Sequence, residues 1–320
     1  MKHTVLTGDR PTGPLHLGHY FGTLANRVAL QGTHPMYVLI ADYQVITDRD
    51  RPGAIQRNIT ELMLDYLAVG LDPDQVTIFQ HSAIPELNQL LLPFLSLVSV
   101  AEIQRNPTVK DEIEHSSQAA VSGLMFTYPV HQAADILFCK GTLVPVGKDQ
   151  LPHVEITRLI ARRFNERYGR VFPEPQALMG DSPLLAGLGG GKMSKSRGNA
   201  IALSATADET AALIRKARTD SERRITFDEA NRPEVANLLL LAGLCLGRSP
   251  ESLAEEIGDG GAAALKSVVT EAVNEFLRPI RARRLELDPD EVRKVLLKGN
   301  EVARERAVRT LDEVRAAMGF

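Results

Sequence analysis

The chain has few cysteines and no long apolar segment. Cys139 and Cys245 are the two cysteines among its 320 residues. Neither has His or Cys neighbours at the spacing of metal ligands, so the sequence indicates neither a disulfide framework nor a zinc site. The most apolar run, residues 90–100, is interrupted by Pro93 and is far shorter than the roughly 20 residues that span a bilayer. Residues 1–10 lack the apolar core of a secretory signal. These absences predict a protein of the reducing cytoplasm.

An excess of one charge is also missing. The 37 Lys and Arg residues nearly balance the 40 Asp and Glu residues, which leaves a formal net charge of −3. This argues against a protein that holds nucleic acid by bulk electrostatics, so any polyanion must meet local basic patches. We find no repeat of fixed period and no low-complexity tract. The length and the 44% apolar composition predict an ordinary globular protein of two domains.

The two halves of the chain differ in periodicity. Residues 1–200 alternate short β-branched runs with helical patterns, which predicts an α/β fold with a Rossmann-like doubly wound parallel sheet. The strands are expected at residues 4–6, 37–41, 76–79 and 143–146, and the helices between them at residues 18–31, 52–69 and 153–168. Residues 201–320 show helical periodicity alone, which predicts a second, mainly helical C-terminal domain. Its helices are expected at residues 206–219, 234–246, 253–256, 261–276 and 290–318.

A glycine-rich turn follows the first predicted strand and opens a helix at residues 8–19. Glycines there permit tight turns, and Gly18 lets the main chain approach a ligand closely. The free N–H groups at the start of the helix can meet phosphate oxygens. His16 and His19 are expected to face the same pocket. The same residues are also compatible with a Gly/Pro turn that is followed by a helix with two surface histidines and that binds no ligand.

A second glycine-rich segment, residues 189–196, reads Gly-Gly-Gly-Lys-Met-Ser-Lys-Ser. It is a flexible loop that brings the ammonium groups of Lys192 and Lys195 within reach of one triphosphate, and lysine is a compact charge suited to phosphate. A solvated basic loop between domains would explain the glycines and lysines. It would not explain why they occur together with the turn at residues 8–19.

Several motifs together resemble those of one enzyme family. Residues 14–19, Pro-Leu-His-Leu-Gly-His, resemble the first signature of the class I aminoacyl-tRNA synthetases, and residues 192–196 match the second letter for letter. Residues 128–137 and 144–150 look like the amino-acid and ribose segments of tryptophanyl enzymes, and the resemblance continues through residues 219–221. The chain is identified as a member of class Ic, which contains the tryptophanyl and tyrosyl synthetases.

The resemblance implies a role for each matching residue. The catalytic residues are expected to be His16, His19, Lys192 and Lys195. The residues expected to bind ATP are Arg10, Pro11, Thr12, Gly18, His19, Gly147, Lys148, Asp149, Leu185, Lys192, Met193, Ser194, Lys195 and Ser196. The residues expected to bind the amino acid are Tyr128, Gln132, Asp135 and Gln150.

Asp135 is expected to select the substrate. It lies in a predicted helix among apolar neighbours, where a carboxylate is costly to desolvate without a partner, and an indole N–H would be such a partner. Gln132 and Tyr128 lie one and two turns earlier and are expected on the same face. An aspartate on the helix surface would also fit the letters.

The resemblance implies an ATP- and Mg²⁺-dependent aminoacyl-tRNA ligase whose substrates are L-tryptophan and tRNA(Trp). Tyrosine is the alternative, because a phenol O–H could also donate to Asp135, and Gln132 and Gln44 depart from the methionine and histidine common in bacterial tryptophanyl enzymes. Residues 144–150 and 219–221 and the overall length favour tryptophan. A nucleotidylyltransferase and a non-catalytic paralogue that acts as a binding partner are further alternatives, against which the intact histidines and lysines argue.

The resemblance also implies a homodimer and a tRNA surface. Residues 88–108 are expected to supply the dimer surface within the catalytic domain at residues 1–200. The apolar side chains expected to be exposed there are Leu90, Leu91, Leu92, Phe94 and Leu97, although a plain core helix would use the same residues. Residues 201–320 are expected to bind the anticodon. The candidate basic clusters are Arg215, Lys216, Arg218, Arg223 and Arg224, and Arg281, Arg283, Arg284, Arg293 and Lys294.

Overall fold

The structure is a computed structural model that describes residues 2–46, 54–115, 121–147, 150–179, 185–191, 193 and 198–320. In this part of the chain a 5-stranded parallel sheet has the order β3-β2-β1-β4-β5. The strands are β1 (Val5–Asp9), β2 (Met36–Ile40), β3 (Val76–Gln80), β4 (Leu143–Val146) and β5 (Gln176–Met179). The predicted Rossmann-like α/β class is confirmed, and each of the four predicted strands overlaps an observed one.

The fifth strand was not predicted. β5 has the sequence Gln-Ala-Leu-Met, which contains no β-branched residue, and it lies at the edge of the sheet with both end residues exposed. A strand of this kind has a weak sequence signal, because β-propensity reflects packing on a half-buried surface. Its position is fixed by pairing with β4, from Leu143 opposite Gln176 to Val146 opposite Met179.

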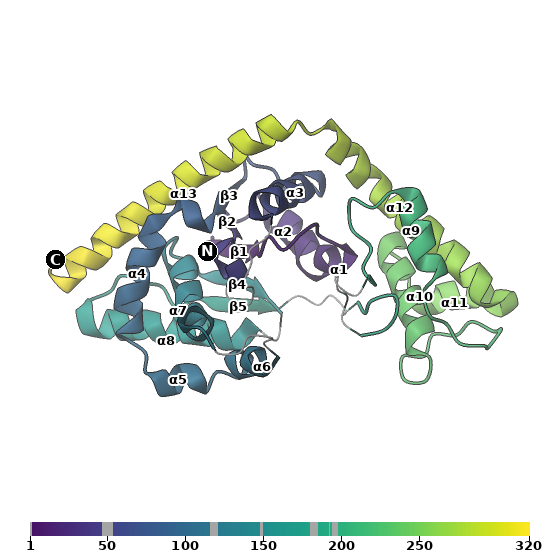
Figure 1. The fold of residues 1–320 in the computed structure, drawn as a ribbon, viewed down its shortest axis with the longest axis horizontal. Coiled ribbons are helices and arrows are strands. Elements are labelled where there is room, and N and C mark those ends of the chain that lie inside the picture. Colours follow the sequence, from purple (N-terminus) through teal and green to yellow (C-terminus); the bar gives the residue numbers. More distant parts are fainter. Residues whose placement is uncertain are drawn as a thin grey trace.

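Helices cover both faces of the sheet (Figure 1). Neighbouring residues on one strand belong to different core clusters: Val5 and Val38 to one, Leu6 and Leu39 to the other. This follows from the alternation of side chains along a strand. The first cluster includes residues of α3 (Ile55–Ala68), and the second includes residues of α4 (Pro85–Leu95), α7 (Gly123–Leu137) and α8 (Leu151–Tyr168).

The remaining helical segments of residues 1–200 follow β1, β2 and β3 along the chain. The helix predicted at residues 18–31 is observed as α1 (Leu17–His19), a π-helical turn (Tyr20–Leu24) and α2 (Ala25–Leu30). Short 3-10 turns follow two strands, at Tyr43–Ile46 and His81–Ala83. Two small helices, α5 (Val100–Gln104) and α6 (Pro107–His115), precede α7.

The region after residue 201 is helical, as predicted. Its helices are α9 (Ala207–Arg215), α10 (Pro233–Leu246), α11 (Pro250–Ile257), α12 (Gly261–Glu286) and α13 (Pro289–Met318), with a 3-10 turn at Gly258–Gly260. α12 is longer than predicted because it continues through Pro279. α13 crosses the sheet region as a long diagonal helix (Figure 1) and contacts β3, α3 and α4. The described residues form no helix long and apolar enough to cross a membrane.

The expectation that all five apolar side chains of residues 90–97 are exposed is wrong. Leu90, Phe94 and Leu97 are buried in the core, whereas Leu92 is 74% exposed. The helical spacing of α4 places Leu90 and Phe94 in the core beside α7 and Leu92 on the opposite side, and Leu97 follows the end of the helix. The dimer itself stays a prediction.

The second basic cluster is largely bound within the protein. Arg284 Nη1 donates to Asp65 Oδ1 (2.6 Å), Arg283 Nε donates to the carbonyl of Ala68 (2.6 Å), and Arg281 Nη2 donates to Thr210 Oγ1 (2.9 Å). These three guanidinium groups therefore join α12 to α3 and α9, and they do not form the free basic surface that the sequence suggested.

Candidate active site

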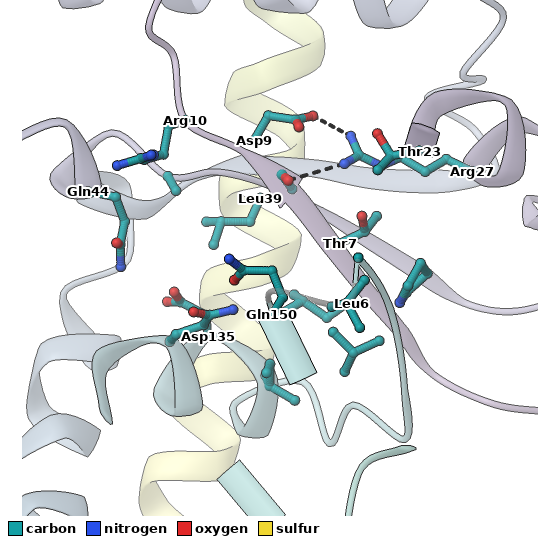
Figure 2. A pocket seen from close by; sticks show the side chains of 18 of the residues that line it. Leu6, Thr7, Asp9, Arg10, Thr23, Arg27, Leu39, Gln44, Asp135 and Gln150 are labelled. Atoms are coloured by element: carbon teal, nitrogen blue, oxygen red, sulfur yellow. Dashed lines mark hydrogen bonds and ion pairs between the residues drawn. The ribbon is translucent and has the colours of Figure 1, made fainter. Parts of the chain in front are cut away.

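A cavity of about 250 Å³ opens at the carboxyl ends of the strands. The end of β1, Leu39 of β2, residues 144–146 of β4 and one face of α7 line it (Figure 2). Ligands of open α/β sheets bind at this edge, where strand order reverses. The order β2-β1-β4 places the reversal between β1 and β4, so the cavity lies where this fold binds its ligands.

The cavity gathers predicted residues from distant parts of the chain. The predicted site residues that line it are Arg10, Tyr128, Gln132, Asp135, Gly147 and Gln150. Arg10 follows β1, Gly147 follows β4, and Gln150 precedes α8. Lys148 and Asp149, between the last two, lie outside the described residues. The topology thus brings Arg10, the amino-acid segment and the ribose segment to one cavity.

α7 supplies the wall that is expected to meet the amino acid. Ser122 begins the helix, because its side chain accepts the N–H of Met125 (3.0 Å). Tyr128, Gln132 and Asp135 all line the cavity, as their spacing predicted. The Tyr128 hydroxyl lies 3.2 Å from Nε2 of the buried His153, which fixes the direction of the phenol.

Asp135 is buried inside the protein, so an exposed position on the helix surface is wrong. Its residue is 1% exposed. Burial and then the nearby charge of Asp42 raise the pKa of Asp135 well above its ordinary 3.8. Among the described residues, its Oδ1 atom has no hydrogen-bond partner, although Nε2 of His81 lies 3.4 Å away. A buried acceptor without a donor costs about 1–3 kcal/mol, so this carboxyl group is suited to accept from a bound molecule.

The two signature histidines lie together. Their ring centroids are 3.7 Å apart, and the His16 N–H donates to Nδ1 of His19 (3.1 Å). Their segment is held by two hydrogen bonds, from the Leu17 N–H to the Ile201 carbonyl (3.0 Å) and from the Leu203 N–H to the Leu15 carbonyl (2.9 Å). His16 is buried, with 8% exposure, so two plain surface histidines are excluded. Neither ring lines the cavity that Asp135 enters.

Gly18 connects the first signature with the lysine loop. A Cβ atom at Gly18 would lie 3.1 Å from Sδ of Met193 and 3.1 Å from the His16 ring. Met193 is the described residue of the Lys-Met-Ser-Lys-Ser motif, and it is buried. The two signatures that are far apart in the sequence therefore meet at a glycine.

The structure provides less support for the other residues that were predicted to bind ATP. Thr12 donates its N–H to the Arg10 carbonyl (2.8 Å), which forms a turn that also contains Pro11. Leu185 is buried in the same core cluster as Met193 and does not line the cavity. The remaining residues of the lysine motif lie outside the described residues, and they are Lys192, Ser194, Lys195 and Ser196.

A buried charged network beside the cavity was not predicted. Arg27, which is 1% exposed, donates to Asp9 Oδ2 and to the Gly8 carbonyl (3.1 Å) (Figure 2). The Tyr66 hydroxyl donates to the same Asp9 oxygen (2.7 Å). Burial alone would raise the pKa of Asp9, but the Arg27 cation and these hydrogen bonds outweigh it and lower the pKa to about 2. Asp9 and Arg27 both line the cavity.

The sequence match that decides the family covers most of the chain. Residues 1–278 match the model of the tRNA synthetases class I (W and Y). The chain belongs to this family. The class I synthetase match accounts for both signatures and for the sheet that carries them.

Relatives of this class I synthetase cover the whole chain. It is 43% identical to the tryptophan–tRNA ligase of Clostridium longisporum, over 100% of this chain and 97% of the relative. It is 40% identical to the tryptophan–tRNA ligase of Treponema pallidum, over 99% and 96%. Its structure is similar to that of the tryptophanyl-tRNA synthetase from Campylobacter jejuni complexed with ADP and tryptophan, with a TM-score of 0.86, 30% identity, and coverage of 99% of this chain and 100% of that chain.

Proposed function

We propose that this class I synthetase is a tryptophan–tRNA ligase, which activates L-tryptophan with ATP and transfers the tryptophanyl group to tRNA(Trp). The Asp135 carboxyl group carries the proposal, because it is a buried polar group in the wall of the cavity, where a bound donor could pair with it. The names of the relatives that match the whole chain at 40% identity or more support tryptophan over tyrosine.

The cavity suits the amino acid. The indole N–H is a donor without acceptor capacity, and Asp135 would accept it. Tyr128, Gln132 and Gln150 line the same cavity and would contact the ring and the amino-acid head group. A substrate that leaves the Asp135 carboxyl group unpaired would bear the full cost of desolvating that group. A buried polar group discriminates in this way between substrates that can pair with it and substrates that cannot.

The first chemical step needs no general base. The tryptophan carboxylate is ionised at neutral pH, and one of its oxygens attacks the α-phosphorus of ATP. A bond forms between the carboxylate oxygen and the α-phosphorus, which gives the mixed anhydride tryptophanyl-adenylate. The bond from the α-phosphorus to the bridging oxygen breaks, and pyrophosphate leaves with the electron pair. Catalysis then consists of positioning the reactants and stabilising negative charge on phosphate oxygens.

The charge-stabilising groups we propose are His16, His19, Lys192 and Lys195. The two histidine rings lie against one another, so both can reach one phosphate group. Arg10, Pro11, Thr12, Gly18 and Gly147 are proposed to hold the rest of ATP. In the second step, the hydroxyl of the terminal tRNA adenosine attacks the tryptophanyl carbonyl and displaces AMP.

Magnesium is proposed to enter with ATP. The described residues contain no group of three or more His, Cys, Asp or Glu side chains that could hold a metal ion. Mg²⁺ usually keeps several waters and is bound through substrate phosphates, so the triphosphate would be its main ligand. The ion would neutralise charge on the departing pyrophosphate.

The assembly that we propose is a cytoplasmic homodimer. Residues 1–200 would form the catalytic domain, including a dimer-forming segment and the lysine loop, and residues 201–320 would bind the anticodon. The exposed Leu92 on α4, with 74% exposure, and Val100 at the start of α5, with 62% exposure, are the apolar side chains that support a contact there.

The direct test is ATP–pyrophosphate exchange with each of the twenty amino acids. Tryptophan is expected to support exchange and tyrosine is not. Exchange with tyrosine alone would overturn the choice of amino acid and leave the ATP chemistry in place, and exchange with none would overturn the enzyme assignment. Asp135→Ala should raise the tryptophan KM about 10- to 150-fold, which corresponds to the roughly 1.5–3 kcal/mol of a hydrogen bond to a charged group. Asp135→Asn keeps an acceptor oxygen and should raise the KM less.

A further inference from the structure

His81 is a buried histidine that lies close to Asp135 but does not line the cavity. It is the first residue of the 3-10 turn His81–Ala83, which follows β3. Its side chain is fully buried, and Nε2 lies 3.4 Å from Oδ1 of Asp135. Asp135 lines the cavity and His81 does not. The carboxyl group therefore lines the cavity and also lies close to an imidazole that does not line it.

The Asp135 Oδ1 atom and the His81 ring approach each other at 3.4 Å, while the neighbouring acidic group has partners of its own. Asp42, the next acidic group, accepts the N–H of Ser82 (2.9 Å) and the side-chain amide of Gln80 (2.7 Å). By contrast, Asp135 Oδ1 and both ring nitrogens of His81 have no hydrogen-bond partner among the described residues. A buried donor and a buried acceptor at 3.4 Å would each be satisfied by a movement of a few tenths of an ångström.

The rings around His81 favour its neutral form. The centroid of the His131 ring lies 4.2 Å away and that of Tyr43 lies 5.4 Å away, and His131 Nε2 is 3.1 Å from Oδ1 of Asn88. Burial and then the neighbouring His131 lower the pKa of His81 well below 6.5, and burial lowers the pKa of His131 to about 4. A neutral imidazole has one N–H to donate, and Asp135 Oδ1 is the acceptor within closest reach of Nε2.

We infer that His81 is a positioning residue for the amino-acid substrate: its Nε2–H holds one oxygen of Asp135, so that the carboxyl group presents its other oxygen to the indole N–H. The inference rests on the proposed function. Hydrogen bonds of this kind are often long in the ligand-free protein and tighten in the complex. His81 thus acts on the substrate through Asp135 and touches no reacting atom.

The inference makes a prediction that depends on the substrate. His81→Leu removes the donor and leaves Asp135 free to turn, so the KM for tryptophan in pyrophosphate exchange should rise about 3- to 10-fold, the range for one neutral hydrogen bond. The KM for ATP and kcat should stay near their original values. The benzothiophene analogue of tryptophan, in which sulfur replaces the indole N–H, has no hydrogen for Asp135 to accept. Its KM should not change with His81→Leu.

Two variants control for a merely structural effect. His81→Gln keeps an N–H donor of similar reach and should restore most of the tryptophan affinity. His34→Leu removes an imidazole whose Nδ1 is also buried without a partner but which does not line the cavity, and it should leave the ratio of the two KM values unchanged. If His81→Leu does not fold, His81→Asn, whose amide is too short to reach Asp135, should give the same selective loss.

The outcomes separate this inference from the proposed function. An equal rise in KM for tryptophan and for the analogue would show that His81 only supports the fold, and an unchanged tryptophan KM would show that it has no role in binding. Either result overturns the inference alone. If the unmodified chain supports no exchange with tryptophan, the proposed function and the inference both fail.

Discussion

Removing the cation from the buried Asp9–Arg27 pair is the strongest test of how the site is held together. Arg27→Met keeps the length of the side chain and removes its charge and donors. Arg27 is 1% exposed, and it donates to both the Asp9 carboxylate and the Gly8 carbonyl at the end of β1. The variant would leave Asp9 with the Tyr66 hydroxyl as its remaining side-chain donor among the described residues. An uncompensated buried charge typically costs about 3–5 kcal/mol.

The pKa of Asp9 gives a second measure of the magnitude. Its fall from 3.8 to about 2 corresponds to about 2 kcal/mol, since one pKa unit is about 1.36 kcal/mol. Because the folded-state pKa is depressed, this stability is fully present above pH 3.8 and is lost as the pH falls through about 2. We therefore expect Arg27→Met to lose about 3 kcal/mol of unfolding free energy at pH 7, and the loss should shrink as the pH falls from about 4 towards 2.

The assay is urea unfolding of both proteins across this pH range. Arg248→Met is the matched control, because Arg248 pairs with Glu256 at 2.6 Å while both side chains are well exposed, at 41% and 61%. Exposed pairs contribute about 0–1 kcal/mol, so this control should lose little. Equal losses in the two variants, or a loss from Arg27→Met that does not depend on pH, would refute the reasoning.

Three further changes test other parts of the molecule. Gly299→Ala should destabilise the protein by about 1–3 kcal/mol or more, because a Cβ there would lie 1.8 Å from the Ile78 carbonyl oxygen; thermal unfolding should show no such loss for Gly123→Ala, where a Cβ meets nothing within 4 Å. Lys195→Ala should slow adenylate formation about 10²- to 10³-fold, as for one lost transition-state donor, and a near-normal pre-steady-state rate would remove this lysine from the mechanism. Leu92→Asp should shift the chain from dimer to monomer in sedimentation at micromolar concentration, whereas a 35.1 kDa species in the unmodified protein would contradict the dimer.

The sequence was sufficient for the parts of the fold that depend on local patterns. The buried strands of the sheet have β-branched residues such as Val38 and Ile40, and the helix that carries Asp135 has apolar residues at helical spacing. The edge strand β5 was not predicted, because Gln176–Met179 has neither β-branched residues nor apolar residues at helical spacing. The local pattern also places Asp135 among apolar residues, and the structure shows that it is buried there.

Contacts between distant residues could not be predicted in this way. Arg27 is the one charged residue of α2, and nothing in the local pattern shows that it is buried, because its burial depends on Asp9 at the end of another element. The exposed side of α4 was misjudged for the same reason, because an apolar run such as residues 90–97 does not show which face meets the sheet. His81 carries no signal at all until the fold places it 3.4 Å from Asp135.

Asp65 shows that the first signature and the C-terminal helices are one structural unit. Its fully buried carboxylate accepts the Leu15 N–H (2.8 Å) with one oxygen and Arg284 Nη1 (2.6 Å) with the other. Leu15 in turn pairs with Leu203, which follows the lysine loop. The backbone that presents His16 is therefore fixed by α3, by α12 and by the segment after the loop together. A chain ending near residue 200 would lose Arg284 and Leu203 and leave the Asp65 charge buried without its cation, at a cost that typically reaches several kcal/mol. The helices after residue 201 thus help to fix the backbone of the first signature, in addition to any role in binding tRNA.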